Sequence, residues 1–63
     1  MQYFVEVKTC GYPNGKIFEV ECVCFSSIEK AEQFAISRRN FTPYSDTYAT
    51  IFTFINGKKA IIR

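Results

Sequence analysis

The chain has 63 residues, of which 48% are hydrophobic and 17% aromatic, and its net charge is +2. This length predicts one domain over residues 1–63, and a domain of this size buries only about 60% of its unfolded surface. No apolar run approaches the roughly 20 residues of a membrane helix, and the first residues lack the basic and apolar segments of a signal peptide. We therefore expect a cytoplasmic protein without membrane association.

The charges are unevenly distributed along the chain. Residues 1–32 carry three Lys and five Glu, a net charge of −2, whereas residues 33–63 carry five basic residues against Asp46, a net charge of +4. The basic half suits an acidic partner, and it equally suits an ordinary solvated rim.

Residues 2–9 have the period-two alternation of a half-buried strand. The segment Gly-Tyr-Pro-Asn-Gly at residues 11–15 predicts a turn, and residues 16–25 return as a second strand. One face of this hairpin is predicted to form the core, through Tyr3, Val5, Val7, Phe18, Val20, Cys22 and Cys24.

Two registers fit this hairpin. A two-residue loop at 14–15 pairs Val7 with Cys22, and a four-residue turn pairs Val7 with Val20. Both keep the same core face, because only a one-residue slip would exchange the faces. The first is preferred because it places a Lys opposite a Glu.

A helix is predicted over residues 27–39. Ser26 and Glu29 have the spacing of a capping box, Asn40 can serve as the C-cap, and Pro43 forbids continuation. The apolar stripe at helical spacing consists of Ile28, Ala31, Phe34 and Ala35.

A loop over 40–46 and a second hairpin complete the chain. Its strands are residues 47–55 and 58–63, joined by Asn56-Gly57, a type I′ turn signal. This turn pairs Phe52 with Ile61 and Thr50 with Arg63 on one face. Because both faces are apolar, periodicity does not say which face meets the helix. The order is ββαββ, an α+β fold with a four-stranded antiparallel sheet and one helix on one face.

The cysteines are the first candidates for chemistry. Cys22 and Cys24 lie two residues apart on one strand, a separation at or beyond the usual disulfide limit, and the chain has no His to complete a zinc site. We expect them to be core side chains in a reducing compartment, with Cys10 on the opposite face. With no general base beside a nucleophile and no Gly-rich phosphate loop, we expect no enzyme, no metal and no cofactor.

One helix covers one face of a sheet, so the chain has more apolar surface than its core can use. Exposed apolar patches usually mark contact surfaces, and Tyr, Phe and Arg are enriched at the centres of interfaces. The predicted surfaces are the uncovered sheet face and a rim at the helix end, and burial in a homodimer is an alternative. The candidate partner-binding residues are Arg38, Arg39, Phe41, Tyr44, Tyr48, Phe52, Phe54, Lys58 and Lys59.

A nucleic-acid-binding sheet is the alternative function. Aromatic and basic residues on one face can stack bases and contact phosphates. That face would hold Tyr48, Thr50, Phe52, Phe54, Lys59, Ile61 and Arg63. No RNA-binding aromatic motif is present, and the pI of 8.5 lies below the value of about 9 typical of such domains.

The ββαββ order and the helix sequence Ser-x-x-Glu-x-Ala-x-x-Phe-Ala resemble small phage-encoded proteins that block host machinery. These include the bacteriophage T7 inhibitor of bacterial RNA polymerase and several small anti-CRISPR proteins. The resemblance spans residues 2–63 as architecture, without a shared motif. It implies a non-catalytic inhibitor that occupies a surface of a host enzyme or defence complex in the host cytoplasm. Unlike the T7 inhibitor, this chain has no Trp and is net basic.

Overall fold

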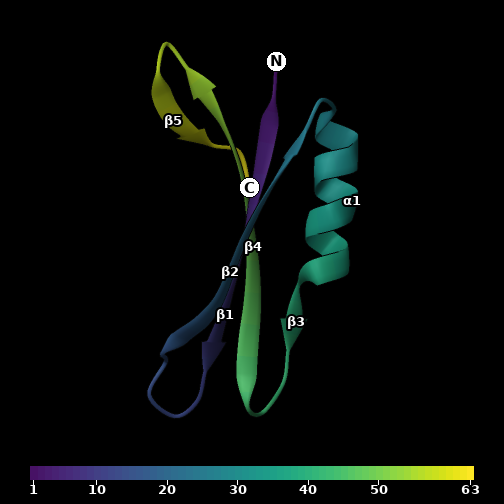
Figure 1. Ribbon diagram of the computed structural model, residues 1–63. Helices are drawn as coiled ribbons and strands as arrows, with labels where there is room; N and C mark the ends of the chain where they lie inside the picture. The colour runs from purple at the N-terminus through teal and green to yellow at the C-terminus, as the bar shows by residue number, and fades with distance from the viewer.

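A computed structural model describes residues 1–63 as one helix packed on an antiparallel sheet (Figure 1). The elements are β1 (Tyr3–Gly11), β2 (Ile17–Phe25), α1 (Ile28–Arg38), β3 (Asn40–Phe41), β4 (Ser45–Ile55) and β5 (Lys58–Ile61). The predicted α+β fold is confirmed, and the two-residue strand β3 is added within the predicted loop. The helix is neither long enough nor apolar enough to span a membrane.

The strands are ordered β2-β1-β4-β3, and β5 also pairs with β4. Because β1 occupies one edge of β4, the short strands β3 and β5 share the other edge at different heights. Figure 1 shows the β4–β5 hairpin bending away from β1, on the side away from α1. The molecule is elongated, with extents of 38 × 22 × 15 Å.

The core lies between α1 and the two central strands. Val5 is completely buried, and it packs in one cluster with Val7, Ala31, Ala35, Ala49 and Ile51. The alanines allow the helix to lie close to the sheet, as the predicted stripe requires, and Ile28 and Phe34 pack at its margin. The buried residues of β4 show which face of the second hairpin meets the helix: the face of Ala49 and Ile51.

The ends of the helix differ from the prediction. Ser27, not Ser26, is the N-cap, and its hydroxyl makes no capping hydrogen bond. The C-cap is Arg39, whose N–H donates to the Ala35 carbonyl at 3.1 Å. Arg39 has an extended backbone because the chain continues directly into β3, so the left-handed conformation that Asn40 would favour is not needed.

Neither predicted register of the first hairpin is correct. Cys10 lies opposite Ile17 next to the turn, but Thr9 pairs with Glu19, so the strands carry a β-bulge in which Phe18 is the extra residue. From there on Val5 pairs with Val23, one residue away from either expectation. A bulge adds one residue to one strand, and that is enough to exchange the faces of β2.

The predicted core of β2 is therefore wrong. Its four members, Phe18, Val20, Cys22 and Cys24, are exposed. Val23 and Phe25 turn towards the helix instead, where the Phe25 ring lies 5.3 Å from that of Phe34. The cysteine expectation is corrected as well. Cys22 and Cys24 are surface thiols, and the pairings place Cys10 on their face rather than on the opposite one.

The second hairpin follows the prediction up to its last residues. Asn56 and Gly57 have φ values of 53° and 78°, as a type I′ turn requires, and Phe52 pairs with Ile61. Ile51 then accepts a hydrogen bond from Ile62 N–H and donates its own N–H to the carbonyl of Arg63, both at 2.8 Å. Residues 62 and 63 thus both lie opposite Ile51, which is a second β-bulge. The predicted pairing of Arg63 with Thr50 is therefore wrong.

Candidate interaction surface

The sheet has one face covered by α1 and one face without any covering element. We call the second the open face. The β-pairings assign to it Phe4, Glu6, Lys8, Cys10, Val20, Cys22, Cys24, Phe41, Asp46, Tyr48, Thr50, Phe52, Phe54, Lys59 and Ile61.

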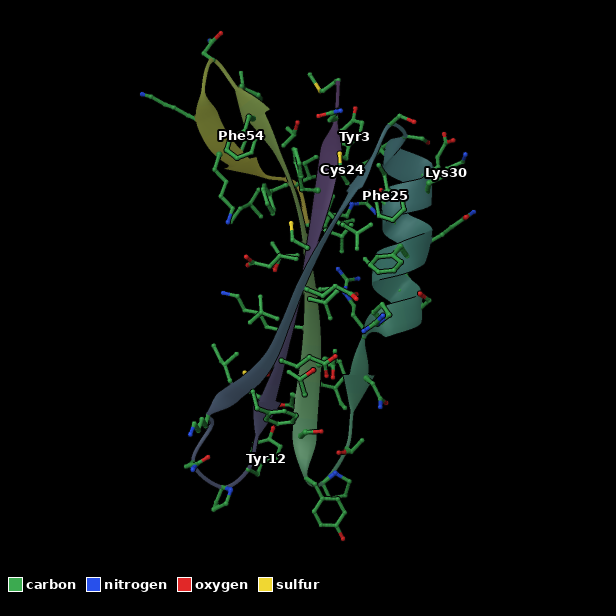
Figure 2. The ribbon with its side chains drawn as sticks, in the orientation of Figure 1. Tyr3, Tyr12, Cys24, Phe25, Lys30 and Phe54 are labelled. Carbon is green, nitrogen blue, oxygen red and sulfur yellow. The ribbon has the colours of Figure 1, made fainter.

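An aromatic cluster lies at one end of the open face. The Phe52 ring stacks on Phe4 with centroids 5.4 Å apart, and Phe54 packs edge-on against both rings. The Lys59 ammonium lies 4.2 Å from the centre of the Phe52 ring. Phe52 is buried by these neighbours, whereas half of Phe54 stays exposed, so the cluster presents an aromatic surface. Figure 2 shows Phe54 on the β4–β5 hairpin, on the side away from the helix.

An apolar row along β2 continues the open face to its edge. Val20 is 59% exposed, and the Cys22 and Cys24 thiols lie beside it on the same face. Phe18, the extra residue of the bulge, is exposed next to the row, and its ring lies against Gly11, where an added Cβ would come within 3.0 Å of it. No charged side chain interrupts this row.

Two tyrosines and a carboxylate occupy the other end of the open face. The hydroxyls of Tyr12 and Tyr48 both donate to Asp46 Oδ2, the second at 3.0 Å. The hydrogen bond to Asp46, reinforced by desolvation and by the negative charge, raises the pKa of Tyr12 to about 12. The separate hydrogen bond from Tyr48 to Asp46 raises the pKa of Tyr48. Figure 2 places Tyr12 at the opposite end of the molecule from Phe54.

The predicted rim at the helix end, made of Arg38, Arg39, Phe41 and Tyr44, does not form one surface in the structure. Arg38 Nη1 lies 3.1 Å from Glu21 Oε1, which is shielded from solvent but accepts no aligned hydrogen bond. Arg39 donates from Nε and Nη2 to the Ala49 carbonyl, at 3.3 and 2.8 Å. Both arginines therefore tie the helix to the sheet. Of the aromatic pair, Phe41 packs edge-on against Tyr48 on the open face, and Tyr44 is exposed at the β3–β4 turn.

The candidate residues of the second hairpin divide in the same way. All of Tyr48, Phe52, Phe54 and Lys59 lie on the open face, but only the last three belong to the aromatic cluster, because Tyr48 lies at the other end beside Asp46. Lys58 is opposite Ile55 and so belongs to the other face. Arg63, expected beside these aromatics, instead lies 3.2 Å from Glu32 of the helix. The bulge opposite Ile51 is the cause, because it turns the last residue towards α1.

Sequence reasoning missed the contribution of β2 to this surface. The sequence pattern places Val20, Cys22 and Cys24 in the core. The available signal was that β2 is apolar on both faces, since Val23 and Phe25 alternate with the row that was chosen. Such a strand cannot be oriented by periodicity alone.

No group of three or more Cys, Asp or Glu side chains comes together in a way that could hold a metal ion. A shallow depression lies beside the aromatic cluster, lined by Met1, Gln2, Phe4, Thr53 and Phe54, and it is open to solvent. Comparisons with protein families, with curated proteins and with solved structures found no match for this chain.

Proposed function

We propose that this protein is a non-catalytic protein-binding module whose open face is the contact surface. The observation that carries the proposal is the continuous apolar area from the β2 row to the aromatic cluster, on a sheet face that no part of the chain covers. Contiguous exposed apolar patches on small proteins usually mark interaction sites, and aromatic anchors held rigidly by neighbours are typical of their centres.

Protein is favoured over nucleic acid as the partner because few basic groups are free on the open face. Lys8 lies 3.4 Å from Glu6, and Arg38 and Arg63 face Glu21 and Glu32 of the chain itself. Lys59 is the basic side chain of the open face without a carboxylate partner, and it sits over an aromatic ring. Binding to a phosphate backbone depends on several such charges.

The resemblance to small phage-encoded inhibitors suggests the partner class. On that basis the partner is a bacterial host enzyme or defence complex, and the protein acts by occupying one of its surfaces.

The test is affinity capture from bacterial lysate with a matched pair of variants. Phe54→Lys places a charge in the open face, whereas Ile36→Lys makes the same kind of change on the outer surface of α1, where Ile36 is 67% exposed. We expect the wild type and Ile36→Lys to retain the same protein and Phe54→Lys to lose it, with weak dependence of retention on salt.

Two results would oppose the proposal. Equal losses for both variants would mean that the open face is not the contact surface. Retention of nucleic acid alone, with affinity that falls steeply as salt increases, would favour the alternative function.

A further inference from the structure

We propose that the free edge of β2 pairs with the same edge of a second copy of this chain, which joins two sheets around a two-fold axis next to Cys22. The proposal concerns the edge of the sheet and not its open face, so it goes beyond the proposed function and does not depend on it.

β2 is the long unpaired edge of the sheet. It has nine residues, and its only partner is β1, whereas the other edge is occupied by the short strands β3 and β5. Natural edge strands are usually protected by charged side chains, by Pro or by bulges. Here the one bulge lies at Phe18, and residues 19–25 beyond it form a regular edge without Pro or Lys. Its two charged residues, Glu19 and Glu21, lie on the helix side, where Glu21 pairs with Arg38.

The hydrogen bonds at the far side of the sheet show which β2 peptide groups are free. Ile51 exchanges both its N–H and its C=O with residues 62–63, so these groups point away from β1. Two residues directly opposite each other in an antiparallel pair either exchange both hydrogen bonds or exchange none. Val5 is opposite Ile51, so its N–H and C=O point away from β4 and towards Val23 of β2. Peptide groups alternate in direction along each strand. The outward-pointing groups of β2 are therefore those of Val20, Cys22 and Cys24.

Charge selects one register among those that align these outward groups. An antiparallel pairing centred on Glu21 would place two copies of that carboxylate opposite each other, and one centred on Val20 would place Glu19 opposite Glu21. A pairing centred on Cys22 places Glu21 opposite Val23 and Glu19 opposite Phe25, with no carboxylates facing. It pairs residues 19–25, whereas a pairing centred on Val23 would use only residues 21–25. Like charges directly opposite destabilise a sheet, so the Cys22 register is favoured.

This dimer would leave the open face available. A two-fold axis perpendicular to the sheet keeps both helices on one side and both open faces on the other. The two apolar rows would then lie side by side, which doubles the surface of the proposed function. Edge pairing is a small interface, so we expect an equilibrium that depends on concentration.

The first experiment measures molar mass by sedimentation equilibrium under reducing conditions, over a series of concentrations. The wild type and Cys22→Ser, which keeps the peptide N–H, should approach twice 7.3 kDa at high concentration. Cys22→Pro should stay monomeric, because Pro removes the outward N–H at the axis without removing a hydrogen bond to β1. Circular dichroism checks that each variant is folded.

The second experiment tests the register and does not depend on Cys22→Pro folding. With only Cys22 left, through Cys10→Ser and Cys24→Ser, a mild oxidant should cross-link the two copies, because paired Cα atoms lie about 5.5 Å apart, within disulfide range. With only Cys24 left, through Cys10→Ser and Cys22→Ser, the two thiols would be roughly 14 Å apart along the strands and should not cross-link.

Three results would overturn the inference: a monomeric wild type at every concentration, a folded Cys22→Pro that still dimerises, or equal cross-linking through Cys22 and Cys24. None of them would affect the capture experiment with Phe54→Lys, so failure of the dimer and failure of the proposed function are distinguishable.

Discussion

Single residues decide which surfaces this small protein presents. Phe18, the extra residue of the first bulge, turns the apolar row of β2 outwards, and Arg63 is turned towards the helix by the second bulge. The guanidinium of Arg39, predicted to bind a partner, donates to the backbone carbonyl of Ala49. Each of these roles depends on backbone geometry that the residue type alone does not encode.

The tyrosine–carboxylate group at the end of the open face gives a prediction about pH. In Asp46→Asn the pKa of Tyr12 should fall from about 12 towards its ordinary value of 10.0, measured by titration of tyrosinate absorbance. In the wild type the folded chain holds this proton more tightly than the unfolded chain does. The interaction therefore stabilises the fold below pH 10.0, and its contribution is lost as the pH rises through about 12. A Tyr12 titration that is identical in wild type and variant would refute the contact.

The two arginines at the helix end should differ in their effect on stability. Arg39→Ala removes two charge-assisted hydrogen bonds to Ala49 and should lower the free energy of unfolding by about 1–2 kcal/mol in urea denaturation. Arg38→Ala removes a half-exposed ion pair with Glu21 and should cost less than about 1 kcal/mol. The reverse order would contradict the assignment of Arg39 to the tie between α1 and β4.

The elements themselves were largely predictable, and their orientation was not. The alternation of β1, the Ala-containing stripe of α1 and the Asn56-Gly57 turn each encode their structure locally, and all three are confirmed. β2 could not be oriented, because it is apolar on both faces and a one-residue bulge reverses them. The prediction of the candidate site was incomplete for the same reason. Its aromatic members on β4 were identified, whereas its β2 members were placed in the core.

The orientation of β2 can be tested on one strand with two matched substitutions. Val23→Ala removes half-buried contacts on the helix side and should lower stability by about 1–2 kcal/mol, while Val20→Ala on the open face should change it by less than about 0.5 kcal/mol. Urea denaturation of both variants provides the comparison. A larger loss for Val20→Ala would support the register expected from the sequence over the one described here.

At the scale of the whole molecule, the sheet is much longer than the single helix that covers it. An 11-residue helix is only about 16 Å long at 1.5 Å per residue, whereas the molecule extends over 38 Å. Beyond the helix, the covered face continues with polar residues, including Thr9 and Thr47, whose hydroxyls lie 3.1 Å apart. The open face stays apolar along the β2 row and at its aromatic end. This asymmetry between the two faces is the basis of the proposed function.

The exposure of the β2 row is the central claim, and thiol labelling of the native protein tests it most directly. At low concentration and without denaturant, Cys22 and Cys24 should react with a soluble thiol reagent nearly as fast as thiols in an unstructured peptide, because both are exposed. Mass spectrometry of the labelled peptides identifies the sites. If both cysteines reacted only at the rate of global unfolding, they would lie in the core, and the open face described here would not exist.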